Sequence, residues 1–83
     1  MSYSVRLDKN ANKFLERLPD ETALRIIKKL EELKEEPFRF LEHFEGRYYK
    51  LRIGDYRALI DIDFEKRVLL IRMLDKRARI YNR

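Results

Sequence analysis

Lysines and arginines recur at alternate positions in one part of the chain. Lys50 and Arg52 are two residues apart, and Arg57 follows the Gly54-Asp55 step. Alternate residues of a strand share a face, so a hairpin here would gather these cations on one side, beside Tyr48. Guanidinium groups bind phosphate oxygens bidentately, and this patch would hold one or two phosphates. The alternative is an ordinary solvated hairpin whose cations pair with nearby carboxylates. Those carboxylates are Asp55, Asp61, Asp63 and Glu65.

A second basic segment comes near the C-terminus, in the run Lys76-Arg77-Ala78-Arg79-Ile80-Tyr81. Single-stranded RNA is bound by arginines that pair with phosphates and by aromatic rings that stack on bases. Lys76, Arg77 and Arg79 supply the charge, and Tyr81 supplies the ring. The alternative is a basic tail without a specific role, since terminal residues are often poorly ordered.

The net charge of +5 is unevenly distributed along the chain. Residues 1–45 hold nine Lys+Arg against ten Asp+Glu, whereas residues 46–83 hold eleven against five. Arginine also replaces lysine as the main cation in the second half. This division favours a nucleic-acid-binding surface carried by a near-neutral scaffold. A network of surface ion pairs, as in proteins from thermophiles, is the alternative.

Length and composition narrow the class of protein. A chain of 83 residues allows a single domain, residues 1–83, with a thin core and an open site rather than an enclosed cavity. There is no cysteine, and the single histidine, His43, is expected to be structural or exposed. We therefore expect no metal site and no small-molecule cofactor. No signal or membrane-spanning segment is apparent, which predicts a cytoplasmic protein without a membrane partner.

Apolar spacing predicts the elements that position these residues. Alternation over 3–7 indicates a strand. Helical spacing follows from an N-cap at Asp8 to Leu18, and again from a cap at Asp20 until Pro37. Alternation returns over 48–53 and 56–63, and 67–74 is almost continuously apolar, as in a central strand. The fold class is therefore α+β, in the order β-α-α-β-β-β, with one antiparallel sheet and two antiparallel helices packed on one face.

Two apolar features remain outside this scheme. The connector 37–46 fits neither period, and we expect Phe38, Phe40 and Phe44 to fold back over the core. A strip of Leu59, Leu69 and Ile71 is expected on positions that the helices do not cover. Such a strip beside a basic region would suit an acidic amphipathic helix of a partner. The alternative is that the connector or the C-terminal segment covers it.

The order and spacing of these motifs resemble a known family. The segments are Tyr49-Lys50-Leu51-Arg52, Gly54-Asp55-Tyr56-Arg57 and Lys76-Arg77-Ala78-Arg79-Ile80-Tyr81, with Leu18-Pro19 between the helices. Together they resemble a RelE-type toxin of the RelE/ParE toxin–antitoxin superfamily over essentially the whole chain. The resemblance implies a RelE-like fold and a ribosome-dependent, metal-independent endoribonuclease that cleaves mRNA in the ribosomal A site and so inhibits translation. Its partners would be the ribosome, mRNA and a neutralising RelB-type antitoxin.

The resemblance also implies roles for individual residues. Lys50 and Arg52 would surround the attacking 2′-hydroxyl, and Arg57 would stabilise the pentavalent phosphate. Arg77 would face the leaving group, and Tyr81 would stack on or activate the substrate. Tyr48, Lys76 and Arg79 are expected to bind RNA.

The identity of the general base stays open at this stage. Arginine does not give up its proton near neutral pH, so Lys50 and Tyr81 are the candidates. The sequence departs from the RelE pattern at Arg52, where a lysine is expected, and at Lys76, where other branches have a histidine. Two other functions keep the fold: a ParE-type toxin that inhibits gyrase, and a non-enzymatic RNA-binding module.

Overall fold

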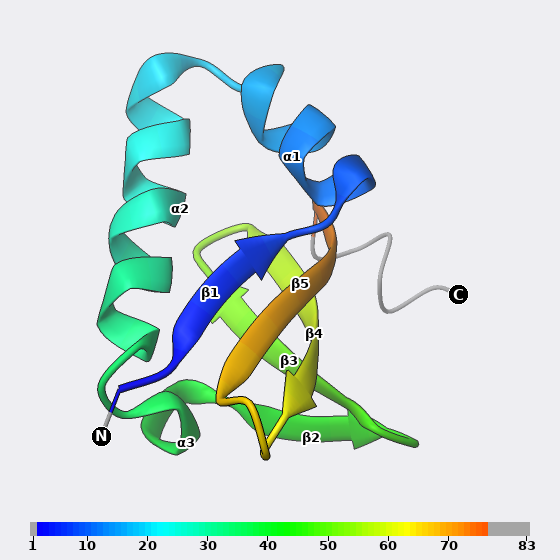
Figure 1. Ribbon diagram of the computed structural model, residues 1–83. Coiled ribbons are helices and arrows are strands. Elements are labelled where there is room, and N and C mark those ends of the chain that lie inside the picture. The colour runs from blue at the N-terminus through cyan, green and yellow to red at the C-terminus, as the bar shows by residue number, and fades with distance from the viewer. Residues whose placement is uncertain (1, 77–83) are drawn as a thin grey trace.

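One five-stranded sheet with helices packed against one of its faces forms the body of the molecule (Figure 1). The structure is a computed structural model that describes residues 2–76. Its elements are β1 (Ser4–Leu7), α1 (Lys9–Glu16), α2 (Asp20–Leu33), α3 (Pro37–Phe40), β2 (Glu42–Glu45), β3 (Tyr48–Ile53), β4 (Tyr56–Asp63) and β5 (Val68–Lys76). The strands lie in the order β1-β5-β4-β3-β2. The predicted α+β class and the helices on one face are confirmed.

The two main helices bury the apolar stripes that the sequence predicts. The Asp8 carboxylate caps α1 by accepting a hydrogen bond of 3.1 Å from the Ala11 amide. The chain then reverses at Leu18-Pro19 and enters α2 (Figure 1). Pro19, rather than Asp20, is the capping residue of α2, and Asp20 lies in the first turn, where its charge favours the helix dipole. No helix within residues 2–76 is long and apolar enough to cross a membrane.

The core lies between these helices and one face of the sheet. Every second residue of β3 and β4 points toward the helices, which is why both strands alternate in the sequence. The best buried core residues, all less than 2% exposed, are Ala11, Ile26, Leu33, Leu51, Ala58, Ile60, Leu69 and Ile71. Burial of this face therefore fixes the opposite residues of the same strands on the other face, named here the open face.

The sheet is mixed rather than wholly antiparallel. The pairs β2–β3, β3–β4 and β4–β5 are antiparallel, but β1 runs parallel to β5, with Val5 opposite Leu69. The α1–α2 hairpin carries the chain from β1, at one edge of the sheet, to β2 at the other. Residue alternation shows which face a side chain takes but carries no information on which neighbour a strand pairs with. The direction of β1 was therefore not predictable from its sequence.

The connector contains structure that the sequence pattern did not reveal. It forms the short helix α3 and the edge strand β2, whose pairing with β3 is irregular between His43 and Glu45. Of its phenylalanines, only Phe40 packs against the core. Phe38 is 51% exposed and stacks on Phe64 at 5.9 Å, and the Phe44 ring lies 5.8 Å from the Lys50 ammonium. The prediction that all three cover the core is wrong.

A bulge in β5 also changes which residues lie on the open face. Ile60 stands opposite Ile71 but Leu59 stands opposite Met73, so Arg72 is an extra residue without a cross-strand partner. Leu69 and Ile71 point into the core and are 0% exposed. The predicted uncovered strip of Leu59, Leu69 and Ile71 is therefore wrong. Leu59 lies on the open face, but it is itself buried.

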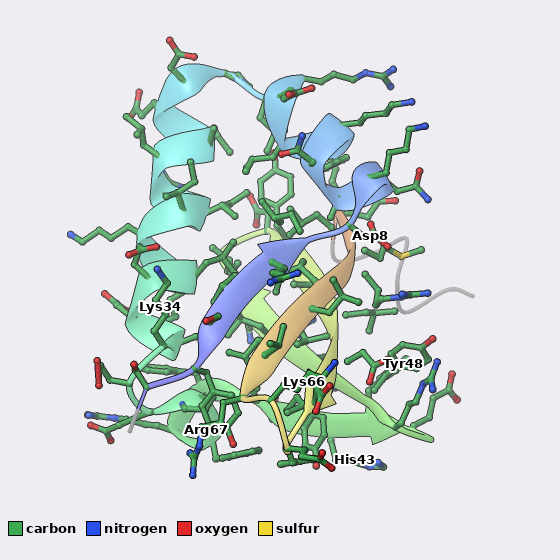
Figure 2. All side chains as sticks on the ribbon, viewed as in Figure 1. Asp8, Lys34, His43, Tyr48, Lys66 and Arg67 are labelled. Atoms are coloured by element: carbon green, nitrogen blue, oxygen red, sulfur yellow. The ribbon has the colours of Figure 1, made fainter. Side chains whose placement is uncertain are left out.

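The turn between β4 and β5 holds a backbone conformation that ordinary residues avoid. Arg67 has φ of 56°, in the left-handed region (Figure 2 labels it beside Lys66). The Arg67 carbonyl accepts a hydrogen bond of 2.9 Å from the Ser4 amide, and Asp63 accepts one of 2.9 Å from the Lys66 amide. These bonds hold the turn and tie it to β1.

Within this turn, glycine should therefore be preferred over alanine at position 67 but not at position 66. We expect Arg67→Gly to exceed Arg67→Ala in free energy of unfolding by about 1 kcal/mol, because alanine keeps the left-handed strain and glycine does not. Both variants lose the contact of the Arg67 guanidinium with the Tyr3 ring at 5.7 Å, so it cancels in the comparison. At Lys66 the order should reverse by about 0.5 kcal/mol. Urea unfolding of the four variants measures both differences, and the same order at both positions would contradict the argument.

Candidate nucleic-acid interface

The cations predicted to form a patch lie on the open face. Register pairs Arg52 of β3 with Arg57 of β4, and Lys50 with Leu59 one step along the same two strands. Because alternate residues share a face, Tyr48 continues this row on β3. Figure 2 shows Tyr48 on the side of the sheet away from α2. The structure thus brings together Tyr48, Lys50, Arg52 and Arg57, as the sequence predicts.

The Arg57 side chain is unusual because it is almost fully covered. It is 3% exposed, and it is the one charged residue classed as buried among residues 2–76. Arg57 also makes polar or ring contacts inside the protein. A buried charge requires such compensation. Burial therefore fixes the position of this guanidinium, and a phosphate would reach it by replacing some of its present neighbours.

Lys50 and Arg52 are more accessible than Arg57. Arg52 is exposed, and Lys50 is half-buried with its ammonium 5.8 Å from the Phe44 ring. Arg52 and Arg57 stand directly opposite each other, an arrangement that like charges make unfavourable. The result is a compact positive group of two strands, with one fixed member and two at the surface. Such a group suits binding of a phosphodiester.

Two of the carboxylates that the solvated-hairpin alternative invokes have other partners. Asp61 forms an ion pair of 3.4 Å with Arg47, in the turn before β3. Asp63 accepts a hydrogen bond from the Lys66 amide instead. Asp75 was not among the predicted carboxylates, and the register places it opposite Arg57 on β5. No sequence signal reveals this, because the bulge at Arg72 shifts the alternation of β5.

The other predicted residues have different positions. Lys76 ends β5 opposite Tyr56, and alternation places it on the helix-covered face rather than beside Lys50. Arg77, Arg79 and Tyr81 lie outside the described residues. His43 is exposed, and its Nε2 lies 2.7 Å from the Gly46 carbonyl oxygen, as expected for a structural or exposed histidine. In residues 2–76 there is no cluster of three or more acidic, histidine or cysteine side chains arranged to hold a metal ion.

A shallow depression of about 800 Å³ lies further along the open face, next to the β4–β5 turn. It is lined by Arg6, Asp61, Ile62, Asp63, Phe64, Glu65, Lys66, Val68 and Leu70. Its carboxylates outnumber its cations, and none of Lys50, Arg52 or Arg57 reaches it. The depression therefore borders the basic group at Asp61, which stands opposite Tyr48, but does not include its cations.

Comparison with known proteins places this fold in a family. The model of the ParE toxin of the type II toxin–antitoxin system parDE matches residues 5–81. The fold resembles RelE in the RelBE2 toxin–antitoxin complex of Mycobacterium tuberculosis, with a TM-score of 0.84, 27% identity and coverage of 93% of this chain and 100% of that one. It also resembles the archaeal RelE–RelB complex of Pyrococcus horikoshii, with a TM-score of 0.78, 29% identity and coverage of 95% and 99%.

A third similar structure is a free E. coli RelE mutant, with a TM-score of 0.78, 27% identity and coverage of 99% of this chain and 93% of that one. Among curated proteins none is significantly similar. Fold and family match together define the class: a toxin of the RelE/ParE superfamily. Within that class, the chain belongs to the ParE toxin family of type II toxin–antitoxin systems.

Repulsion between the facing residues Arg52 and Arg57 should lower the free energy of unfolding, and a neutral residue at position 52 should raise it again. We expect Arg52→Gln to raise the free energy of unfolding by about 0.5 kcal/mol at low salt, because it removes a like-charge pair. The gain should disappear near 1 M salt, where charges are screened over about 3 Å. Arg72→Gln is the matched control: it lowers the net charge equally but removes an ion pair of 3.9 Å with Asp8. Denaturant unfolding at two salt concentrations tests this, and an equal gain in both variants would contradict it.

Proposed function

We propose that this toxin is a ribosome-dependent endoribonuclease that cleaves mRNA in the ribosomal A site. The observation that supports it is the grouping of Lys50, Arg52 and Arg57 on adjacent strands of the open face, with Arg57 fixed by burial. Cleavage of RNA by its own 2′-hydroxyl requires cations around one phosphate and does not require a metal. The group has the charge and the compactness for that task.

The proposed reaction is an internal transesterification. The 2′-oxygen attacks the adjacent phosphorus and loses its proton, the bond to the 5′-oxygen breaks, and that oxygen takes up a proton. A 2′,3′-cyclic phosphate and a 5′-hydroxyl result. Negative charge grows on the non-bridging oxygens in the transition state, where fixed guanidinium groups are most effective. Lys50 and Arg52 would surround the attacking oxygen, and Arg57 would stabilise the pentavalent phosphate.

The other residue roles in this proposal come from the resemblance to RelE-type toxins, and several of these residues lie outside the described range. Arg77 would face the leaving 5′-oxygen, and Tyr81 would stack on or activate the substrate. Tyr48, Lys76 and Arg79 would bind RNA, although the register puts Lys76 on the other face from Lys50. Lys50 and Tyr81 remain the candidates for the general base, because arginine keeps its proton.

The open geometry supports a large partner that completes the site. Arg52 is exposed and Lys50 is half-buried on a sheet face rather than in an enclosed cavity, so water is excluded from them only when another surface covers them. We propose the ribosome with its bound mRNA as that surface. We further propose a RelB-type antitoxin as the neutralising partner, since the similar toxins of M. tuberculosis and P. horikoshii occur in complexes with antitoxins. We propose the cytoplasm as the site of action, because the ribosome is there.

A second function is favoured by the family match itself. The matching family model describes the ParE toxin, and the sequence resemblance implies gyrase as the target of that branch. Such a toxin would need no group of cations arranged around a phosphate. A non-enzymatic RNA-binding module is a third possibility with the same surface.

Loss of Arg57 should reduce cleavage far more than binding. We expect Arg57→Gln to lower the rate of mRNA cleavage on the ribosome by about 100- to 1,000-fold, because one fixed transition-state donor is lost. Arg52→Ala, at an exposed position, provides a second test that does not disturb a buried group. Primer extension on a translated message with added ribosomes measures the rate, and thermal unfolding verifies that both variants fold. Equal losses of rate and affinity would indicate a binding module instead.

The two toxin branches differ in a direct assay of their targets. We expect the wild-type protein to cleave a translated message and to leave gyrase supercoiling of plasmid DNA unchanged at the same concentration. The control is Arg72→Ala, which changes an exposed arginine outside the basic group and should cleave normally. Inhibition of supercoiling without any cleavage would assign the protein to the gyrase-inhibiting branch.

A further inference from the structure

The basic group continues beyond the residues already assigned, toward the turn between β2 and β3. Arg47 lies in this turn, directly before Tyr48. Its Nε is 3.4 Å from Oδ2 of Asp61, and its guanidinium carbon is 5.8 Å from the centre of the Tyr48 ring. Asp61 stands directly opposite Tyr48 on β4. The carboxylate therefore holds the Arg47 guanidinium beside the ring on the open face, where Figure 2 shows Tyr48.

The spacing along β3 matches that of a nucleic-acid strand. Tyr48, Lys50 and Arg52 follow one another at two-residue intervals, which corresponds to a rise of about 6.7 Å per step. Neighbouring phosphates in extended single-stranded RNA have a similar separation. With the scissile phosphate held at Lys50 and Arg52, the next nucleotide would lie about one such step beyond Lys50, at Arg47 and Tyr48. There the arginine would meet a phosphate, and the ring would meet a base, the pairing used in single-stranded binding.

The ion pair between Arg47 and Asp61 is suited to exchange. The Arg47 side chain is 70% exposed and that of Asp61 is 23% exposed, so solvent screens their attraction and the pair contributes little stability. A phosphate offers the guanidinium a bidentate acceptor in place of one carboxylate contact. Asp61 then positions Arg47 in the free protein without binding it strongly.

We propose that Arg47 and Tyr48 form a second RNA subsite, which binds the phosphate and base of a nucleotide beside the scissile step. Asp61 is a positioning residue that holds Arg47 over Tyr48 in the free protein and competes with RNA for its guanidinium. The inference deepens the proposed ribonuclease function and rests on it for the identity of the substrate. It adds Arg47 and Asp61, neither of which the motifs singled out as RNA-binding.

A matched control exists elsewhere in the chain. Arg39 in α3 is 69% exposed, lies 5.7 Å from the Phe40 ring and has a carboxylate partner, Glu36, at 4.0 Å. It therefore reproduces the exposure, ring contact and ion pair of Arg47 away from the open face. Arg47→Ala and Arg39→Ala remove the same charge from equivalent local surroundings.

Binding of a short single-stranded RNA with 2′-O-methyl riboses tests the subsite, because this RNA lacks the attacking hydroxyl and is not cleaved. Fluorescence anisotropy would be followed from about 50 to 200 mM salt. We expect Arg47→Ala to reduce the slope of log affinity against log salt by about 0.7, the value for one phosphate contact on a single strand. Arg39→Ala should keep the wild-type slope. Equal slopes for the two variants, or no binding by wild type at the lowest salt, would overturn the subsite.

Asp61 and Tyr48 give independent readouts. Asp61→Asn should bind the RNA about two- to five-fold more tightly, because Arg47 no longer leaves a carboxylate, and this gain should vanish in the Arg47→Ala background. Tyr48→Phe should keep the affinity, whereas Tyr48→Leu should lose it through the missing stack. A gain from Asp61→Asn that persists without Arg47 would contradict the positioning role.

A binding assay with vacant ribosomes shows whether the phosphate belongs to the substrate RNA or to ribosomal RNA. Weaker binding of Arg47→Ala to vacant ribosomes, with unchanged binding to the single-stranded RNA, would mean that Arg47 contacts ribosomal RNA and would overturn the subsite. The failure of the ribonuclease proposal is distinct. In that case wild type would not cleave a translated message, while binding of the free RNA would still depend on Arg47. Cleavage by wild type with identical behaviour of Arg47→Ala and Arg39→Ala would remove the subsite alone.

Discussion

The division of β3 and β4 into two chemically different faces is the constraint on which the rest of the molecule depends. Leu51, Ala58 and Ile60 are buried under the helices, while Lys50 and Arg57 lie on the opposite side of the same strands. Because side chains alternate with a period of two, a slip of one residue would bury the cations and expose the core. Burial of the apolar face therefore sets the register that assembles the basic group. One strand register therefore positions both the core residues and the basic group.

The sequence predicted which face of a strand each side chain takes, because local alternation encodes it. It did not predict features that depend on pairing between strands distant in the sequence. Lys50 and Arg52 were placed correctly because β3 is a regular strand, and Arg57 followed from the short Gly54-Asp55 turn. Asp75 faces Arg57 because the bulge at Arg72 changes the parity of β5 beyond it. Leu69 and Ile71 face the core because the register from the β4–β5 turn pairs them with Ile62 and Ile60. The parallel direction of β1 and the edge strand β2 depend on tertiary contacts. The ion pair of Arg47 with Asp61 likewise joins residues that no motif links.

The basic group shows how a site can oppose the stability of the scaffold that holds it. Arg52 faces Arg57 directly, and Arg57 is 3% exposed, so the fold tolerates both like-charge repulsion and the burial of a cation. Hydrophobic burial on the other face offsets these costs, because the free energy it contributes does not depend on which residues occupy the open face. Such sites are common where function requires an arrangement that stability alone would not select. The conflict is local, and the helices are not part of it.

Small size and an open site would impose a particular division of labour on the proposed ribonuclease. A guanidinium is most effective when its position is fixed and water is excluded. The chain fulfils the first condition by burying Arg57 among its own residues, but an exposed sheet face does not fulfil the second. A covering surface must then supply exclusion of water and orientation of the substrate, which a ribosome with mRNA in place would provide. In the proposed complex the exposed residues Arg47 and Arg52 would meet this surface, and the buried Arg57 would lie beneath them.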